Sequence, residues 1–216
     1  PSTGEPKSRM QELLDEDGRC NLTRVMLDFI LSETINLNTD IKKTLWVFPN
    51  CSDKWIRNIS NKYLISLKSQ IGRTLSARMI HCLLSETKKS EKVILVGSDI
   101  PSLSKNNIIK SINLLDHNDI VLGPSYDGGF YLIGIKDNVT CQQLLEYGDL
   151  SSCSGIKSYF LNLNKKVSTL DKLKELYELV AWTAGVKDYA DPILDKIDPD
   201  GTIFKKRMPQ KAFLVP

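Results

Sequence analysis

The stretch from Lys92 to Gly134 constrains the fold of this chain more than any other. Its first four apolar residues, Val93–Val96, show no polar alternation, which is typical of a strand buried on both faces of a parallel sheet. Pro101 cannot donate to a sheet ladder and disfavours helix at the residue before it, so Asp99 should lie at the carboxyl end of this strand. Ligands bind at that edge in open α/β sheets, which makes Asp99 a candidate site residue.

The rest of this stretch predicts a crossover helix, a strand, a turn and another strand. Residues 105–115 have the apolar spacing of a helix, and residues 119–122 and 130–133 are apolar runs that fit strands of the same sheet. The turn between the two strands contains Asp127, Gly128 and Gly129. Such a turn is most often an ordinary hairpin, but its glycines also allow a ligand to approach the backbone closely. Together with Asp99, Asp127 could hold Mg²⁺ or Mn²⁺ against a diphosphate.

Composition restricts the class of function. The chain has 216 residues, of which 41% are hydrophobic and 25% charged, as in an ordinary globular protein. The net charge of +3 argues against nucleic acid as the main partner. The absence of an apolar run long enough for a bilayer leads us to expect a cytoplasmic protein without a membrane partner. Five scattered cysteines without a Cys-x-x-Cys pair argue against a disulfide framework or a zinc site.

The residues before this stretch predict a second group of elements. A helix is expected from about residue 20, a buried strand over 44–48, a short extended segment over 63–67 and a helix from about residue 75. Arg73 and Arg78 could face a ligand or water, and a solvated helix face is the preferred interpretation. His81 and His117 are interpreted as surface or helix-cap residues. Residues 1–10 form a polar loop that is either a disordered terminus or a phosphate-binding segment.

Four segments, in this order, resemble a bacterial transferase family with a glycosyltransferase-A-type fold. The segments are Pro1-x-x-Gly4-x-x-Lys7-Ser8-Arg9-Met10, Gln70-x-Gly72-x-x-Leu75-x-x-Arg78-Met79, Val96-Gly97-Ser98-Asp99-Ile100-Pro101 and Gly123-Pro124-x-x-Asp127-Gly128-Gly129-Phe130-Tyr131-Leu132-Ile133-Gly134. The resemblance covers residues 1 to about 150. It implies a three-layer α/β fold with a mostly parallel, Rossmann-like sheet and helices on both faces.

The resemblance also implies roles for individual residues. The predicted nucleotide contacts are Gly4, Lys7, Arg9, Gln70 and Gly72. Asp99 would be the metal ligand and, with Asp127, a catalytic residue, while Gly128 and Gly129 would line the acceptor side. The implied partners are a nucleotide-sugar or nucleoside triphosphate and a small-molecule acceptor, with Mg²⁺ or Mn²⁺ as cofactor and a homo-oligomer as a possible assembly.

Two features depart from the family pattern. The family has an apolar strand ahead of the Pro1 loop that this sequence does not contain. It also has a D-x-D-T segment after residue 150, for which Val167–Thr169 is a poor substitute.

The end of the chain resembles a different family. Tyr177–Gly185 and Lys187–Pro192 are similar to the carboxy-terminal-domain phosphatases of the haloacid dehalogenase superfamily, in which Thr183 would bind phosphate. The aspartate nucleophile that such enzymes need upstream is absent, and Asp198–Thr202 is interpreted as a turn. We therefore expect a nucleotide-binding domain over residues 1–150 and an α/β tail over 151–216.

The sequence predicts a metal-dependent transferase that uses a nucleotide-activated donor, by glycosyl or nucleotidyl transfer. The alternatives are a phosphatase of the haloacid dehalogenase type and a nucleotide-binding protein without catalytic activity.

Overall fold

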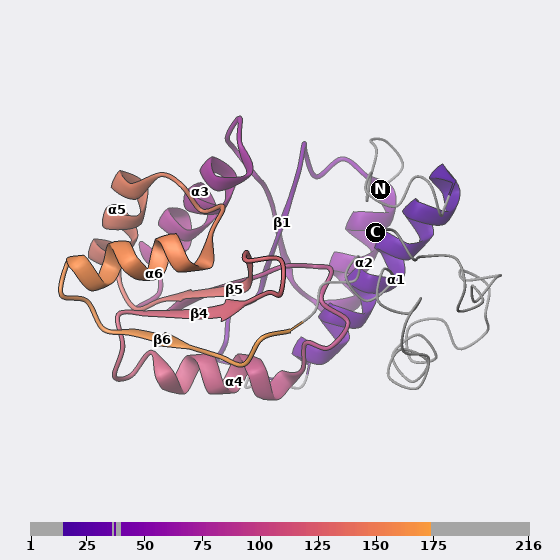
Figure 1. Ribbon diagram of the computed structural model, residues 1–216. Helices are drawn as coiled ribbons and strands as arrows, with labels where there is room; N and C mark the ends of the chain where they lie inside the picture. The colour runs from indigo at the N-terminus through magenta and orange to yellow at the C-terminus, as the bar shows by residue number, and fades with distance from the viewer. Residues whose placement is uncertain (1–14, 36, 38–39, 174–216) are drawn as a thin grey trace, which may run out of the picture.

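The computed structural model of the chain describes residues 15–35, 37 and 40–173 (Figure 1). In chain order its helices and strands are α1 (Glu16–Ile35), β1 (Thr44–Val47), α2 (Lys54–Tyr63), β2 (Ser66–Ser69), α3 (Leu75–Thr87), β3 (Val93–Val96), α4 (Lys105–Leu114), β4 (Ile120–Pro124), β5 (Phe130–Ile135), α5 (Asn138–Tyr147), α6 (Cys153–Asn162) and β6 (Val167–Thr169).

These bounds confirm most of the elements expected from the sequence. The prediction for residues 63–67 was partly wrong, because Tyr63 is the last residue of α2 and β2 begins only at Ser66. The helix ends there because Leu64 adopts a left-handed conformation, with φ of 51°, and its N–H donates back to the carbonyls of Ser60 and Asn61.

The strands form two sheets in the described part of the chain. β1 and β2 pair in parallel, and the other four strands have the order β3-β5-β4-β6. β5 is antiparallel to both β3 and β4, whereas β6 is parallel to β4. The crossover from β3 through α4 to β4 was expected, but the sequence did not show that β5 lies between these two parallel strands. The larger sheet is therefore mixed.

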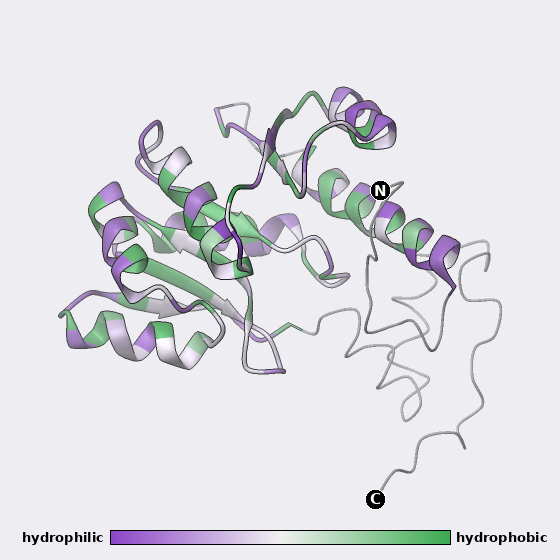
Figure 2. Ribbon diagram, turned by 90° about the horizontal axis from the view of Figure 1, so that it is seen from above, coloured by the Kyte–Doolittle hydropathy of each residue, from purple (hydrophilic) through white to green (hydrophobic). Residues whose placement is uncertain are grey.

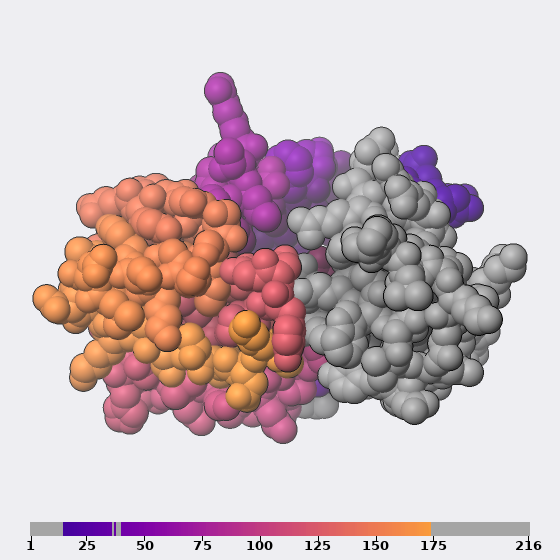
Figure 3. All heavy atoms as spheres, in the orientation of Figure 1, coloured from indigo at the N-terminus to yellow at the C-terminus, as the bar shows by residue number. Residues whose placement is uncertain are grey.

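Helices cover both faces of the larger sheet, which confirms the expected three-layer α/β architecture. On one face Ile80, Leu83, Leu144 and Phe160 of α3, α5 and α6 belong to a buried cluster with residues of β4 and β5. On the other face α1 and α4 pack in a second cluster. Figure 1 shows α3, α5 and α6 above the strands and α4 below them, and Figure 3 shows the same segments with all their heavy atoms.

The sheet is apolar because its central strands are buried on both faces. Ile120, Leu122, Leu132, Ile133 and Ile135 are fully buried. Central strands are mostly green in the hydropathy view, whereas the helices carry both green and purple residues (Figure 2). This pattern is typical of strands covered on two sides by amphipathic helices.

The segment after residue 150 continues the same sheet as far as it is described. β6 pairs with β4, and Ile156 and Phe160 of α6 are fully buried in the cluster of α3 and α5. Residues 151–173 therefore pack with the first domain. The rest of the predicted tail, from residue 174, lies outside the described residues, and its assignment as a separate unit stays a prediction.

Candidate functional site

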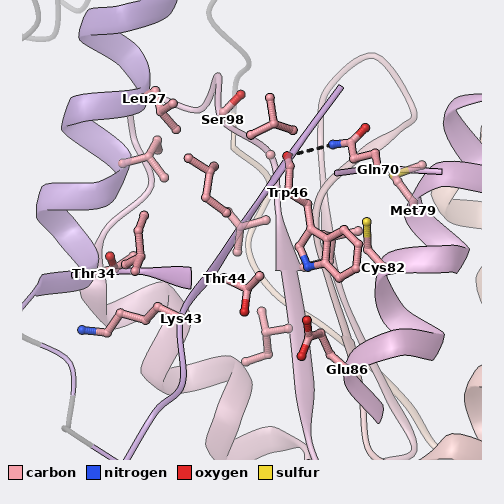
Figure 4. Close-up of a pocket in the computed structure, with 18 of the residues that line it drawn as sticks. Leu27, Thr34, Lys43, Thr44, Trp46, Gln70, Met79, Cys82, Glu86 and Ser98 are labelled. Carbon is pink, nitrogen blue, oxygen red and sulfur yellow. Dashed lines mark hydrogen bonds between the residues drawn. The ribbon is translucent and has the colours of Figure 1, made fainter. Parts of the chain in front are cut away.

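A large cavity lies between the two sheets and is lined by β1, by β3 and by the residues before and after these strands. Its volume is about 1490 Å³. α1 lies on one side and α3 on the other, with residues of β1 between them (Figure 4). Four of the site residues predicted from the sequence line this cavity: Gln70, predicted to contact the nucleotide, Asp99 and Asp127, predicted to be catalytic, and Gly129, predicted to lie on the acceptor side.

Gln70 is fixed directly after β2 by two hydrogen bonds to β1. Its backbone N–H donates to the carbonyl of Val47 at 2.8 Å, and its side-chain Nε2 donates to the carbonyl of Trp46 at 3.0 Å (Figure 4). Since the amide nitrogen is used in this way, the side chain can offer Oε1 to a ligand as a hydrogen-bond acceptor. Gln70 thus lines the cavity with its amide nitrogen engaged, and its predicted contact with a nucleotide stays a prediction.

Gly72 shapes the turn that leads from Gln70 into α3. Its φ is +142°, and a Cβ atom built there would lie 2.8 Å from the backbone nitrogen of Arg78 and 2.9 Å from the Cβ of Ala77. Only glycine fits this position without displacing backbone. Gly72 is not among the residues that line the cavity, so its predicted role near the nucleotide depends on the shape of the turn.

Phe48, which lines the cavity, pairs with Arg78 of α3, a contact that the sequence did not reveal. The guanidinium carbon of Arg78 lies 4.2 Å from the centroid of the Phe48 ring, and Phe48 as a whole is 55% exposed. Nε of Arg78 is buried and has no hydrogen-bond partner within the described residues. Phe48 ends an apolar run and Arg78 lies on a helix, so both residues looked ordinary in the sequence.

Asp99 lies just beyond the carboxyl end of β3, as predicted. It is half-buried and lines the cavity. Gly97 anchors the start of this turn, because its N–H donates to the carbonyl of Tyr131 on β5 at 2.9 Å. Asp99 is therefore held against the sheet at the edge where a ligand would bind.

Asp127 stabilises the turn between β4 and β5. Its Oδ1 accepts hydrogen bonds from Oγ of Ser125 at 2.6 Å and from the N–H of Gly129 at 2.9 Å. Gly128 is exposed, with φ of +92°, and is not among the cavity residues, whereas Gly129 is. The hairpin interpretation of this turn is therefore correct, and the catalytic role of Asp127 and the acceptor role of both glycines stay predictions.

Other candidate chemistry is limited in the described part of the chain. Burial raises the pKa of the Cys82 thiol, which lines the cavity, to about 11, and that of the Cys141 thiol to about 11, so neither is a nucleophile at neutral pH. No group of three or more His, Cys, Asp or Glu residues suited to a metal ion occurs among the described residues. Gly4, Lys7 and Arg9 lie outside the described residues.

The fold is shared with nucleotidyltransferases of the glycosyltransferase-A-like, Rossmann-like type. A solved structure described as a nucleotide-diphospho-sugar transferase from Desulfovibrio desulfuricans G20 superposes with a TM-score of 0.73 at 22% identity, covering 92% of this chain and 91% of that one. A cytidylyltransferase from Leptospira borgpetersenii serovar Hardjo-bovis (strain JB197) superposes with a TM-score of 0.52 at 10% identity, covering 88% of each chain. At these identities the likeness establishes the fold.

The chain belongs to the family described as "Uncharacterized protein conserved in bacteria (DUF2064)", which it matches over residues 32–152. Among curated proteins it is similar to the 2-phospho-L-lactate guanylyltransferases of Methanocaldococcus vulcanius (strain ATCC 700851 / DSM 12094 / M7) and Methanobrevibacter smithii (strain ATCC 35061 / DSM 861 / OCM 144 / PS). The first is 31% identical over 130 residues, which is 60% of this chain and 55% of that protein. The second is 29% identical over 137 residues, which is 61% of this chain and 57% of that protein. The chain thus spans little more than half the length of these relatives.

A second family matches the end of the chain. Residues 167–214 match the family described as "NLI interacting factor-like phosphatase", which agrees with the phosphatase resemblance noted in the sequence. Most of this match, Thr183 included, lies outside the described residues. Within the described part of the chain, none of the helices has the length and apolarity required to cross a membrane.

Proposed function

We propose that this protein transfers a nucleotidyl group from a nucleoside triphosphate to a small-molecule acceptor, with a divalent cation as cofactor. The observation that supports this most directly is the convergence of Gln70 and Asp99 on one cavity at the carboxyl edge of the sheets. The curated relatives are guanylyltransferases, which favours nucleotidyl transfer over glycosyl transfer and guanine over other bases.

The polar groups of the cavity fit the parts of a nucleoside triphosphate. Phe48 lines the cavity and is exposed, so its ring offers a stacking surface, and base–aromatic stacking contributes ~1–3 kcal/mol. Oε1 of Gln70 can accept from the N–H groups on the Watson–Crick edge of guanine. Arg78, whose guanidinium lies against the Phe48 ring, adds a positive charge that would favour an anionic ligand.

Asp99 fits the role of a single protein ligand for Mg²⁺ or Mn²⁺. Magnesium is commonly held by one or two carboxylates together with substrate phosphates, so a closed cage of protein ligands is not required. When bound there, the cation would supply neutralisation of the leaving diphosphate. Asp127 is a weaker candidate as a second ligand, because Oδ1 already accepts two hydrogen bonds within its turn.

The proposed reaction is an in-line displacement at the α-phosphorus. An oxygen of the acceptor forms a bond to this phosphorus, the bond from phosphorus to the bridging oxygen breaks, and pyrophosphate leaves with the electron pair. The chain would contribute by holding the base at Phe48 and Gln70 and the phosphates near Asp99, so that the reacting atoms are aligned.

Ligand-dependent thermal stabilisation tests the proposal. We expect GTP with Mg²⁺ to raise the melting temperature more than CTP or UTP, and Asp99→Asn to remove the Mg²⁺-dependent part of the increase. Asp171→Asn is the matched control, because Asp171 is an exposed aspartate paired with Lys110 at 3.2 Å and lies outside the cavity. Absence of stabilisation by any nucleotide at millimolar concentration would refute the proposal, and stabilisation without turnover of any acceptor would favour a binding protein.

The match to a phosphatase family supports a second candidate function. We expect Thr183→Ala to abolish hydrolysis of p-nitrophenyl phosphate, and Asp99→Asn to leave it intact, if the tail carries this activity. The absence of hydrolysis by the unaltered chain would exclude it.

A further inference from the structure

Asn50 is an exposed residue of the cavity, three residues after the end of β1. Its Oδ1 accepts hydrogen bonds from the backbone N–H of Ser52 at 2.9 Å and from Oγ of Ser52. A backbone N–H can only donate, so the amide atom that faces it is the oxygen, and the orientation of this amide is fixed. Nδ2 has no hydrogen-bond partner among the residues that the structure describes, so Asn50 can offer a donor to a ligand.

Gln70 offers the opposite group of its amide to the same cavity. Its Nε2 donates to the backbone carbonyl of Trp46 at 3.0 Å (Figure 4). A carbonyl oxygen can only accept, so the orientation of this amide is fixed as well, and Oε1 is the atom that can accept from a ligand. The two side chains therefore form a complementary pair, with a donor on Asn50 and an acceptor on Gln70.

The two amides lie at the same end of one pair of strands. β1 and β2 are parallel, and Val47 at the end of β1 is opposite Ser69 at the end of β2. Gln70 follows Ser69 directly. Sγ of Cys51 lies 3.2 Å from Oγ of Ser69, so the chain neighbours of Asn50 and Gln70 are in contact with each other. One small ligand can therefore meet both amides.

The segment that carries Asn50 is held in place before any ligand binds. Arg57 of α2 donates to two of its carbonyls, from Nε to that of Cys51 at 3.2 Å and from Nη2 to that of Ser52 at 2.7 Å. Together with the bonds from Ser52 to Asn50, these contacts fix the turn after β1. A fixed donor and acceptor lose little conformational entropy when a ligand binds, which favours selection by hydrogen bonding.

Phe48 supplies a stacking surface next to this pair. It lies two residues before Asn50 and lines the cavity. The guanidinium of Arg78 lies over its ring, and Phe48 is still 55% exposed. A planar ring can therefore stack on Phe48, since stacking requires only an accessible face. A stacked base would present its edge, where its donors and acceptors lie, to hydrogen-bonding groups in the same plane.

We propose that Asn50 selects guanine in this cavity, by donating from Nδ2 to O6 while Oε1 of Gln70 accepts from N1–H. This inference rests on the proposed function, in which the donor is a nucleoside triphosphate. Guanine has an acceptor at position 6 beside a donor at position 1, and only Asn50 can donate to the first and only Gln70 can accept from the second.

A purine with an amino group at position 6 presents the reverse order. Its amino group would meet the donor of Asn50, and its bare N1 would meet the acceptor of Gln70. Neither amide can turn over to adapt without losing its hydrogen bond to the backbone. A base turned over to restore both bonds would point its ribose to the other side, away from the phosphate position proposed near Asp99. The pair therefore discriminates against such a base.

Calorimetric titration with two nucleotides in the presence of Mg²⁺ tests this proposal. 2,6-Diaminopurine riboside triphosphate differs from GTP only at positions 1 and 6 of the base. We expect the unaltered chain to bind GTP roughly 5- to 150-fold more tightly than this analogue, the discrimination typical of a two-bond contact with a base edge. Asn50→Asp should lower this ratio of affinities at least fivefold, because it keeps Oδ1 for Ser52 and replaces only the donor.

The ratio separates base recognition from the added charge. A negative charge weakens the binding of both triphosphates alike, so it cancels in the ratio. Asn58→Asp is the matched control, because Asn58 is an exposed residue of α2 that does not line the cavity, and it should leave the ratio unchanged.

Three results would overturn the role of Asn50. They are equal affinities of the unaltered chain for the two nucleotides, an unchanged ratio in Asn50→Asp, and an equal change of the ratio in Asn58→Asp. In each case GTP still binds, so the proposed function would stand. Absence of binding by any nucleotide would refute the proposed function and this inference together.

Discussion

The turn at Gly72 allows a test of how the structure positions the proposed nucleotide site. Replacement by alanine forces a side chain onto a backbone with φ of +142° and brings Cβ to 2.8 Å from the nitrogen of Arg78. The backbone conformation alone costs ~1–3 kcal/mol for a residue other than glycine. The overlap with the first turn of α3 adds ~1–3 kcal/mol, as in overpacked cores.

Gly128→Ala is the matched control for this substitution. Gly128 also has positive φ, +92°, but a Cβ atom there meets nothing within 4 Å, so only the backbone term of ~1–3 kcal/mol applies. We expect Gly72→Ala to lower the free energy of unfolding by ~2–6 kcal/mol and always by more than Gly128→Ala.

Urea unfolding at neutral pH measures both variants, and titration with GTP measures the consequence for the site. We expect weaker GTP binding in Gly72→Ala, because displacement of the turn moves Gln70, and unchanged binding in Gly128→Ala. Equal losses of stability in the two variants would show that the close approach of Gly72 to Arg78 is not a constraint, and the reasoning would fail.

Two further predictions concern a ligand contact and a helix cap. Phe48→Ala should weaken GTP binding by roughly 5- to 150-fold, the equivalent of ~1–3 kcal/mol of stacking. The control Leu64→Ala, at a 92% exposed position, should leave GTP binding unchanged. Calorimetric titration measures both affinities, and an affinity of Phe48→Ala equal to that of the unaltered chain would exclude stacking on Phe48. Asp137→Ala should destabilise the protein by about 1 kcal/mol at pH 7, because Asp137 caps α5 by accepting from the N–H of Thr140 at 2.7 Å. Burial opposes the charge of Asp137, but the hydrogen bond from the backbone N–H of Thr140 holds its pKa below the ordinary value. The contribution of Asp137 to the free energy of unfolding is therefore present above the unfolded pKa of about 3.9 and is lost as pH falls through the lower folded pKa. Urea unfolding of Asp137→Ala and of the unaltered chain at pH 7 and at pH 2.5 measures this. An equal loss of stability in Asp137→Ala at both pH values would contradict it.

The position of Asp99 was predictable because local chemistry determines it. Val93–Val96 has the apolar run of a buried strand, and Pro101 ends it, so no information about distant residues was needed. The same holds for Asp127, whose hydrogen bonds with Ser125 and Gly129 are contained in one turn. Short-range patterns identified both acidic turns correctly.

Features that depend on tertiary structure were not predictable from these patterns. The position of β5 between β3 and β4 depends on pairing between segments that are far apart in the chain, and strand order is not encoded in hydrophobic periodicity. Phe48 resembled a core residue at the end of a strand, yet more than half of its surface is exposed. Its significance arises only from Arg78, which is brought to it by the packing of α3 beside β1.

The central place of β5 has a consequence for the order of folding. β4 and β5 form a hairpin whose turn comprises only residues 125–129, whereas the pairing of β3 with β5 must close a much longer loop. Short loops close at the lower entropic cost, so the hairpin should form first and then provide the edge on which β3 docks. Pulse-labelled hydrogen exchange during refolding should therefore protect β4 before β3; simultaneous protection would show that the two strands dock in one step.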